Sequence, residues 1–457
     1  MKNQKERNVK IFKMSKERIE ILWFKRDLRT EDNPILSKPN LKVLPIFIFD
    51  ENILKNLPKN DKRVNFIFEN VLNLKEKLKE KNLDLAIFYG KPKDVFDFLS
   101  EKFEIVKIYS SSDNDIYSKK RDELIKSKYD LQIIFDNFLI EPEKILSREG
   151  KPIKVFSFFL KKAENLIYSN PIKKYNNLEN LKRVDFDYNK LIYLKNKVVE
   201  NKKIQIESLN FEKEKIKFQG ANLNPSALLK RFEKIIDNYE LERNFPYKNS
   251  TSLLSVHLRF GTISIREVLS WALNQKNYKA FLREIFWREF FNYLFYHFSK
   301  IEETGLRKIN IYWINDEKLF EKWKKAETGI PLVDAGMRQL EEEGFIHNRV
   351  RMVVSDFLVK KLKVNWQLGE KYFALKLLDY ESSSNLGNWQ WVTGIGADPK
   401  SLYRSFNPFI QSKKFDKDGF YIKKYLPELQ NIPISKLHNP KYFQENKIKN
   451  YPWKNQL

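Results

Sequence analysis

The chain of 457 residues carries 85 lysines and arginines against 60 acidic residues, a formal net charge of +25, and it contains no cysteine. The lack of cysteine excludes disulfides, thiolate nucleophiles and cysteine-ligated metal sites, and its 4 histidines are too scattered in the sequence to suggest a metal centre. No run approaches the roughly eighteen apolar residues of a membrane span, and the basic N-terminus lacks the apolar region of a secretory signal. We therefore expect a cytoplasmic protein.

The positive charge is compatible with a polyanionic partner, because basic surfaces attract nucleic acid. The chain is also rich in lysine, asparagine, isoleucine and phenylalanine, a composition that A·T-rich codons would produce without any such partner. Net charge alone leaves both explanations open, and the positions of the cations must decide between them.

The first 150 residues have the pattern of an α/β domain. Residues 1–18 form a basic N-terminal extension, in which Met14 is an alternative start to Met1. From residue 19 onward, short β-prone runs alternate with charged helical stretches, clearest over 61–80 and 115–126. The alternation predicts a doubly wound, parallel five-stranded sheet within 19–150. The candidate strands are residues 19–24, 43–49, 83–89, 105–110 and 131–135.

Glycine is scarce where a nucleotide-binding sheet would need it. Before Gly220 the only glycines are Gly90 and Gly150, and neither G-x-G-x-x-G nor the P-loop pattern occurs. A conventional Rossmann dehydrogenase and a P-loop ATPase are therefore disfavoured.

The second half of the chain has helical periodicity. Residues 151–224 are polar, lysine-rich and weakly periodic, which predicts an interdomain linker. From 225 to 457 we predict an all-α domain, and eight of the nine tryptophans lie beyond residue 270. The clearest amphipathic stretches are residues 226–242, 265–274, 280–298, 332–343 and 349–361.

Three stretches of this helical half combine charges, amides and aromatic rings. Spacing places Glu284, Trp287, Arg288 and Phe291 on one helical face, and Asn348, Arg351 and Met352 on another. A third stretch, residues 378–391, holds two carboxylates, an amide and two tryptophans. Taken alone, the first of these stretches could be the exposed edge of an ordinary core helix.

Five motifs occur in the order seen in DNA photolyases and cryptochromes, and the chain resembles that family from about residue 19 to 429. The resemblance is closest to the class I enzymes, and it implies an all-α FAD-binding domain and light-dependent repair of cyclobutane pyrimidine dimers in DNA by electron transfer from reduced FAD. The alternatives are a cryptochrome-type photoreceptor and a six-four photolyase. The motifs are WFKRDLRTEDNP (23–34), TSLLSVHLRFGTIS (251–264), EIFWREFF (284–291), GIPLVDAGMRQL (329–340) with HNRVRM (347–352), and the DYE…NLGNWQW segment (379–391).

The resemblance implies a set of flavin contacts. Thr251 to Ser255 could equally be a plain helix N-cap, although free N–H groups at a helix start suit a pyrophosphate. Arg351 is expected to pair with Asp379, because either charge buried alone would be costly. Asn385 matches the position facing flavin N5, where plant cryptochromes carry Asp, so it favours repair. The implied contacts are Tyr239, Thr251, Ser252, Leu253, Leu254, Ser255, Arg288, Asn348, Arg351, Asp379, Tyr380, Glu381 and Asn385.

Three tryptophans match the electron relay of the family, namely Trp389, Trp366 and Trp313. Indole is large and oxidisable, which suits such a relay. A single tryptophan is more often a core residue, so the three together carry this interpretation.

The resemblance also places a lesion-binding hollow and a DNA-backbone contact. Trp287 and Trp391 would stack on a flipped dimer, and Glu284 would hydrogen-bond a pyrimidine carbonyl. Six-four photolyases carry histidines at the positions of Asn348 and Met352, so these two residues favour the cyclobutane dimer. For Lys413 and Lys414 a solvated surface explains the charge equally well. The implied backbone contacts are Arg349, Arg404, Gln411, Lys413 and Lys414.

A few positions depart from the family pattern. Glu381 replaces a usual Asp, Leu253 a frequent Arg and Phe281 a frequent Trp, which bears on flavin affinity. Tyr117 and Ser118 replace the Asn–Glu pair that some members use for a folate antenna. We therefore expect FAD, leave the presence and identity of a second antenna chromophore in the N-terminal domain open, and expect a DNA partner, no metal, no membrane contact and a monomer.

Overall fold

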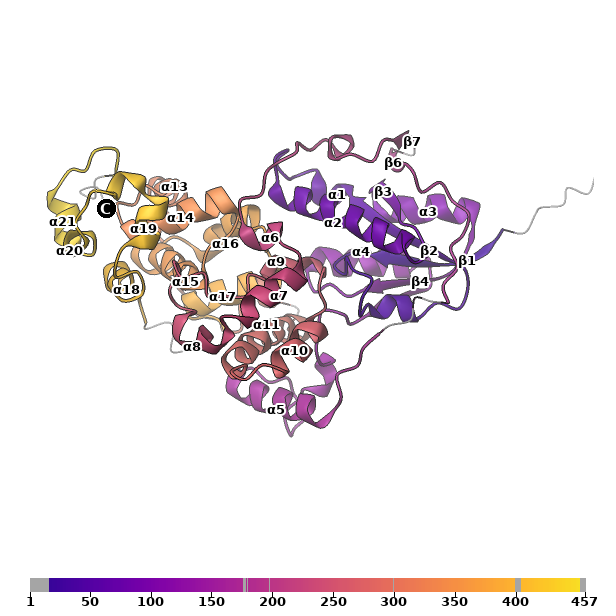
Figure 1. Cartoon of the computed structure of the whole chain (residues 1–457), viewed down its shortest axis with the longest axis horizontal. Coiled ribbons are helices and arrows are strands. Elements are labelled where there is room, and N and C mark those ends of the chain that lie inside the picture. The colour runs from indigo at the N-terminus through magenta and orange to yellow at the C-terminus, as the bar shows by residue number, and fades with distance from the viewer. Residues whose placement is uncertain are drawn as a thin grey trace, which may run out of the picture.

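The computed structural model describes residues 16–175, 178, 180–196, 198–298, 300–398 and 404–452. Most of the predicted N-terminal extension, including Met14, lies outside these residues. Figure 1 shows a strand-containing half built from the N-terminal residues beside a helical half, with α20 (Ile434–Leu437) and α21 (Pro440–Glu445) at the end away from the sheet.

The N-terminal half is a seven-stranded sheet in the order β5-β4-β1-β2-β3-β6-β7. All neighbouring strands are parallel except β6 and β7, which form an antiparallel pair. The predicted α/β fold is confirmed, with two strands more than predicted. The strands are β1 (Arg18–Phe24), β2 (Val43–Asp50), β3 (Ala86–Gly90), β4 (Glu104–Ser111), β5 (Leu131–Ile134), β6 (Leu191–Lys195) and β7 (Val198–Lys202).

The central strands are apolar throughout because both faces of the sheet are covered. Alternate residues of β1 enter different cores: Ile21 and Trp23 pack on one side, and Leu22 and Phe24 on the other. The second of these cores continues into the helical half, where it includes Phe260. The helices of the sheet region are α1 (Glu51–Leu54), α2 (Lys62–Lys79), α3 (Pro92–Lys102) and α4 (Ile116–Lys126).

The segment 151–224, predicted as a linker, contains regular structure. Besides β6 and β7 it holds α5 (Phe156–Ser169) and α6 (Gln219–Asn222). Helix α5 packs on α11 (Lys279–His297), where the ring of Phe159 lies 5.1 Å from that of Phe290. Figure 1 shows α5 beside α11 and α10 (Ile265–Leu273). The segment therefore supports the helical half directly, and the predicted domain boundaries stay predictions.

The five helical stretches predicted after residue 225 are present, although the first is broken between residues 234 and 238. A π-helical turn, Phe357–Lys361, continues α15 (Asn348–Asp356). No helix among the described residues is long and apolar enough to cross a membrane. The remaining helices are α7 (Pro225–Glu233), α8 (Tyr239–Glu242), α9 (Ser255–Phe260), α10 (Ile265–Leu273), α12 (Ile301–Thr304), α13 (Glu317–Lys324), α14 (Pro331–Glu343), α15 (Asn348–Asp356), α16 (Trp366–Lys376), α17 (Ser382–Thr393), α18 (Pro408–Phe415), α19 (Phe420–Tyr425), α20 (Ile434–Leu437) and α21 (Pro440–Glu445).

The two halves meet where α9 ends against the turn that follows β1. Leu28 N donates to Phe260 O at 3.2 Å. The next residue, Gly261, has φ +64, and a Cβ there would overlap the backbone of Arg26. Only glycine meets both demands. Residues of the 23–34 motif are therefore in direct contact with the helical half.

Candidate functional site

Helix α11 presents the first group of predicted site residues. Glu284 is about one-third exposed and forms an ion pair with Arg243, which follows α8. Trp287 stacks on Phe156, the first residue of α5, with ring centroids 3.6 Å apart and planes 7° from parallel. Neither Arg243 nor Phe156 was predicted as part of the site.

The predicted flavin contact Arg288 lies on the side of α11 that faces the α/β half. Its Nη1 donates to the backbone oxygen of Asn137, at 2.9 Å, in the loop after β5. Burial, together with the nearby positive charge of Arg26 and against the opposing Glu289 carboxylate, lowers the pKa of the Arg288 guanidinium to about 10. A buried cation of this kind is expected to attract an anionic partner.

Glu289, the next residue of α11, was not singled out from the sequence. Its Oε1 accepts hydrogen bonds from the N–H groups of Leu139 and Ile140, at 2.8 and 3.1 Å, whereas its buried Oε2 has no protein partner. Burial raises the pKa of this carboxyl to about 7. Glu289 therefore titrates near neutral pH while it ties α11 to the α/β half.

This titration predicts a pH-dependent stability. The pKa of the Glu289 carboxyl is about 7 in the folded protein and 4.5 when the chain is unfolded, so the folded state is favoured most below pH 4.5, where the carboxyl is protonated in both states. This stabilisation is lost as the pH rises through 7. Glu289→Gln keeps an acceptor for both N–H groups. We therefore expect the free energy of unfolding of the wild type to fall, relative to this variant, by about 3 kcal/mol between pH 4.5 and 8. Denaturant titrations of both proteins across that range measure the difference; parallel curves would contradict the assignment.

The predicted ion pair between Arg351 and Asp379 is present. Arg351 Nη2 lies 2.9 Å from Asp379 Oδ2, and its Nε donates to Ile346 O at 2.7 Å. The carboxylate is almost fully buried, and the guanidinium is about one-quarter exposed. A second contact of Nη2 with Asp379 Oδ1 fixes the carboxylate at the start of the segment that leads into α17.

Asn385 is held by a carboxylate that sequence analysis missed. Its Nδ2 donates to Oε1 of Glu370, at 3.0 Å, and the hydroxyl of Tyr380 lies 3.4 Å from the same oxygen. Burial raises the pKa of Glu370. The motif offered no signal for this residue, because Glu370 lies on α16 and reaches Asn385 only through the packing of α16 on α17.

Glu381, the residue that departs from the usual Asp, reaches into the α/β half. Its carboxylate pairs with Arg26, whose other terminal nitrogen pairs with Asp113 after β4. Arg259 lies 3.8 Å from the same Glu381 oxygen. The longer side chain therefore connects the start of α17 to the turn that follows β1.

The segment Thr251–Ser255 does not behave as a plain N-cap. The capping position of α9 is Leu254, and no side chain caps the helix. Leu253 has φ +58, a conformation that non-glycine residues rarely adopt and that clusters at functional sites. Arg231 donates to Thr251 O and thereby holds the segment in place. The structure thus disfavours the N-cap alternative.

Tyr239 lies in an aromatic cluster at the edge of this region. Its ring contacts Phe232 and Phe281 at centroid distances of 5.4 and 5.7 Å. Burial raises the pKa of Tyr239 to about 12. Phe281, which replaces a frequent Trp, is a core residue of the same cluster.

The three tryptophans predicted to form the relay differ in burial. Trp389 and Trp366 are buried, and Trp313 is partly buried. A Cβ on Gly369 of α16 would overlap the Trp389 ring, so α16 lies directly on this indole, one turn beyond Trp366. The segment with Trp313 is hydrogen-bonded to the residues just before α16, where Ile314 N donates to Lys363 O at 2.8 Å.

Helices α15 and α18 carry the predicted lesion and backbone contacts. Arg349 donates to Asn244 Oδ1 at 2.6 Å, and its guanidinium lies over the ring of Phe415 at 4.4 Å. Its buried Nε has no protein partner, and burial together with the Arg243 charge lowers its pKa. Asn348 and Met352 lie on the same helix, at its start and one turn on.

The remaining backbone contacts are spread over an exposed edge. Arg404 is exposed, and its Nη1 lies 3.9 Å from Asp398. Gln411, on α18, has a buried Oε1 without a protein hydrogen bond. Lys413 and Lys414 are exposed at the end of the same helix, as either of the two interpretations of their charge requires.

Several buried polar atoms near Glu381 and Arg288 have no protein hydrogen-bond partner, and they test whether a cofactor such as FAD fits. They include Nε and Nη1 of Arg259, Nδ2 of Asn292 and Nδ2 of Asn137. Buried polar groups are nearly always hydrogen-bonded, so a group without a protein partner is expected where a ligand supplies one. Phosphate, ribose and ring heteroatoms offer that mixture of partners, and the residues fit FAD.

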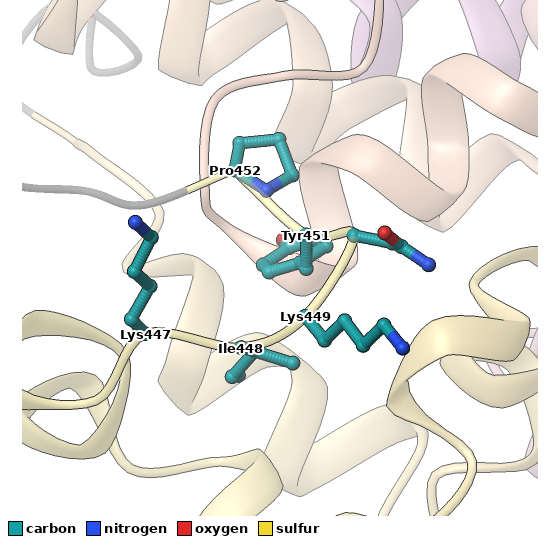
Figure 2. Close-up of a pocket in the computed structure, with 6 residues that line it drawn as sticks. Lys447, Ile448, Lys449, Tyr451 and Pro452 are labelled. Atoms are coloured by element: carbon teal, nitrogen blue, oxygen red, sulfur yellow. The ribbon is translucent and has the colours of Figure 1, made fainter.

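Two further regions are separate from these residues. Figure 2 shows a pocket lined by residues 447–452 of the C-terminal segment, with the side chains of Lys447 and Lys449 at opposite ends; none of these is a predicted site residue. In the α/β half, the hydroxyl of Tyr117 donates to Asp50 at 2.6 Å, and Asp115 caps α4 by accepting from the backbone N–H of Ser118 at 2.7 Å. Within the described chain no cluster of His, Asp and Glu side chains could hold a metal ion.

Comparison with known proteins agrees with this geometry. Residues 20–176 match the family model described as DNA photolyase, and residues 281–455 match the FAD binding domain of DNA photolyase. The chain is 32% identical to the deoxyribodipyrimidine photo-lyase of Buchnera aphidicola subsp. Acyrthosiphon pisum, over 93% of this chain and 91% of that protein.

Solved structures give the same result. An archaeal photolyase from Sulfolobus tokodaii with two FAD molecules superposes with a TM-score of 0.78 and 32% identity, covering 95% of each chain. The cryptochrome of Synechocystis sp. PCC6803 superposes with a TM-score of 0.76 and 25% identity, covering 93% of this chain and 91% of that one.

Proposed function

This chain belongs to the DNA photolyase family, with FAD as its cofactor, and we propose that it repairs cyclobutane pyrimidine dimers in DNA by electron transfer from photoexcited reduced FAD. The proposal makes the protein a deoxyribodipyrimidine photo-lyase. The residues that would carry out this repair are the predicted site residues whose packing was described above. FAD, when bound, would supply the electron under blue light.

The observation that carries the proposal is the close approach of α11 and α17. A Cβ on Gly387 would overlap the ring of Phe291, so the two helices touch there. Trp287 lies four residues before Phe291 and Trp391 four residues after Gly387, one turn from the contact on each helix. Helix α15 packs against α17 as well, which brings Met352 to the same group of helices.

The chain's own groups would act on the lesion by binding and orienting it. Extruding a damaged pair costs a few kcal/mol, which stacking on Trp287 and Trp391 offsets. Arg243 and Arg349 lie near each other and would bind phosphate oxygens beside the flipped bases. Glu284, released from Arg243, would then hydrogen-bond the pyrimidine ring.

Other residues would hold the cofactor. Asp379 and Arg351 would fix each other beside the flavin ring, and Asn385, held by Glu370, would face N5 with a neutral amide. The 251–255 segment would offer backbone N–H groups to the pyrophosphate. Buried aromatic side chains around these groups would exclude water from them.

The lesion class is tested by comparing three oligonucleotides that carry a cyclobutane dimer, a six-four product or no lesion. Asn348 and Met352 favour the cyclobutane dimer, so the chemically reduced holoprotein is expected to restore only that oligonucleotide under blue light. Repair of the six-four product alone would assign the chain to the other enzyme class. Repair of neither would favour the photoreceptor that the likeness to the Synechocystis cryptochrome allows.

The buried ion pair gives a prediction about the cofactor. Asp379→Asn leaves the Arg351 guanidinium without its counter-charge, and loss of one partner of a buried pair destabilises strongly. Because Arg351 is about one-quarter exposed, we expect the free energy of FAD binding to weaken by about 2 kcal/mol, which corresponds to roughly 30-fold lower affinity. Titration of apoprotein with FAD, followed by flavin fluorescence, measures the affinity. Wild-type FAD affinity in this variant would show that the ion pair does not contribute to flavin binding.

A further inference from the structure

Trp389 has two aromatic neighbours that do not belong to the predicted relay. Its ring centroid lies 5.2 Å from that of Phe373, on α16, and 6.4 Å from that of Trp323, near the end of α13. Both contacts are edge-to-face, with interplanar angles of 80° and 70°. Aromatic rings at such separations are in direct contact. Trp389 therefore contacts a second oxidisable indole.

Trp323 is fully buried and firmly held. Its Nε1–H donates to Val354 O at 3.1 Å, and its ring stacks against that of Phe373 at 5.9 Å and 14°. Packing alone would account for a buried tryptophan in this position. A further aromatic contact of Trp323, with Tyr372, leads towards the surface, and a packing role does not require this contact.

The next ring in this direction is Tyr372, on α16. Its centroid lies 5.8 Å from that of Trp323. The hydroxyl lies 3.3 Å from Lys324 O and 3.4 Å from Oε2 of the exposed Glu341. Lys376 pairs with the same glutamate oxygen at 2.7 Å. The series Trp389, Trp323 and Tyr372 thus ends at a phenol beside a solvated carboxylate.

We propose that Trp323 and Tyr372 form a second route by which an electron reaches Trp389 from the protein surface, branching from the route through Trp366 and Trp313. The inference rests on the proposed function, because the initial oxidant is a photoexcited oxidised flavin that takes one electron from Trp389. Trp323 then gives one electron to the Trp389 radical cation, and Tyr372 gives one electron to Trp323. The phenolic proton passes to the Glu341 carboxylate or to water, so that Tyr372 ends as a neutral radical.

The surroundings of Tyr372 favour this end point. Burial raises the pKa of the phenol, and the nearby Glu341 charge raises it further, so the side chain is protonated before oxidation. An oxidised phenol is a strong acid, and Glu341 lies close enough to accept its proton directly or through one water. Lys324 and Lys376 each place Nζ 5.9 Å from the ring, which disfavours a positive charge on it and favours the neutral radical.

The test uses the oxidised holoprotein with the Trp366→Phe substitution, which interrupts the predicted relay after Trp389. After a blue-light flash we expect a tyrosyl radical, detected by electron paramagnetic resonance and transient absorption. Adding Tyr372→Phe or Trp323→Phe to this background is expected to lower the radical signal by at least about tenfold. The signal does not depend on DNA, and flavin content and circular dichroism check that each variant is folded and loaded.

Tyr425→Phe, in the same background, is the matched control. Tyr425 is also a buried phenol bonded to a glutamate of α14, since its hydroxyl lies 2.6 Å from Glu343 Oε1, but its ring neighbour is Tyr421. We expect this change to leave the radical signal intact. A tyrosyl signal that survives Tyr372→Phe, or that is absent from the Trp366→Phe protein, would overturn the second route. Repair by chemically reduced protein needs neither route, so failure of the route and failure of the proposed function are distinguishable.

Discussion

Replacing Glu284 by alanine is expected to lower the yield of dimers repaired per absorbed photon about tenfold, while the FAD content stays at the wild-type level. Glu284 is about one-third exposed on α11, and its partner Arg243 also lies near the surface. Loss of one charge-assisted hydrogen bond to the lesion costs about 1.5 kcal/mol, close to a factor of ten. Quantum-yield measurements on dimer-containing oligonucleotide, with flavin absorbance as the loading check, measure both quantities.

Glu284→Gln is the matched variant for this test. An amide can donate to a pyrimidine carbonyl and accept from a ring N–H, so we expect it to retain most of the yield. Loss of yield in both variants, with intact binding, would point to the negative charge instead of the hydrogen bond. An alanine variant that purifies without FAD would show that Glu284 supports the cofactor and does not bind the lesion.

Replacing Trp389 by phenylalanine is expected to slow photoreduction of oxidised flavin by at least about a hundredfold, with repair by chemically reduced protein left largely intact. Trp389 is buried, and the predicted relay and the proposed second route both begin at its ring. Phenylalanine keeps most of the packing but is far harder to oxidise, so the electron supply stops at this position. Flavin absorbance under continuous blue light with an external reductant measures the rate.

Trp271→Phe is the matched control for this change. Trp271 lies on α10 and contacts Phe232 and Phe281, in the core around Tyr239 instead of the relay. We expect it to leave photoreduction within about twofold of the wild type. Equal loss of photoreduction and of repair in Trp389→Phe would refute the relay role, because repair by pre-reduced protein does not need this electron.

The sequence predicted the architecture because its signals are local. Alternating β-prone and helical runs identified the first five strands, and helical spacing identified α10, α11, α14 and α15. Strand β6 was missed because its short apolar run lies in a lysine-rich stretch whose composition is that of a linker, and β7 was missed because it lies exposed at the edge without an apolar pattern. Helix α5 was missed for a different reason: the lysine-rich sequence around it obscures the helical spacing of the apolar residues that pack on α11.

The candidate site was predictable where both partners lie in motifs that resemble the family. Arg351 and Asp379 belong to two such motifs, and their pairing was expected from the resemblance and is supported by the cost of burying either charge alone. Arg243, Glu289 and Glu370 were missed, because each acts through a tertiary contact between segments that no local pattern connects. The reach of Glu381 to Arg26 belongs to the same class, since it depends on how the helical half is seated on the turn after β1.

The central claim is that light drives dimer repair through FAD bound among these helices. The most direct measurement counts cyclobutane dimers in an oligonucleotide after exposure to the fully reduced holoprotein, in blue light and in the dark. The account predicts that the dimers disappear only in the light, in proportion to the reduced flavin present, with no net change in flavin oxidation state. Equal dimer counts in light and darkness, with reduced flavin present throughout, would contradict it.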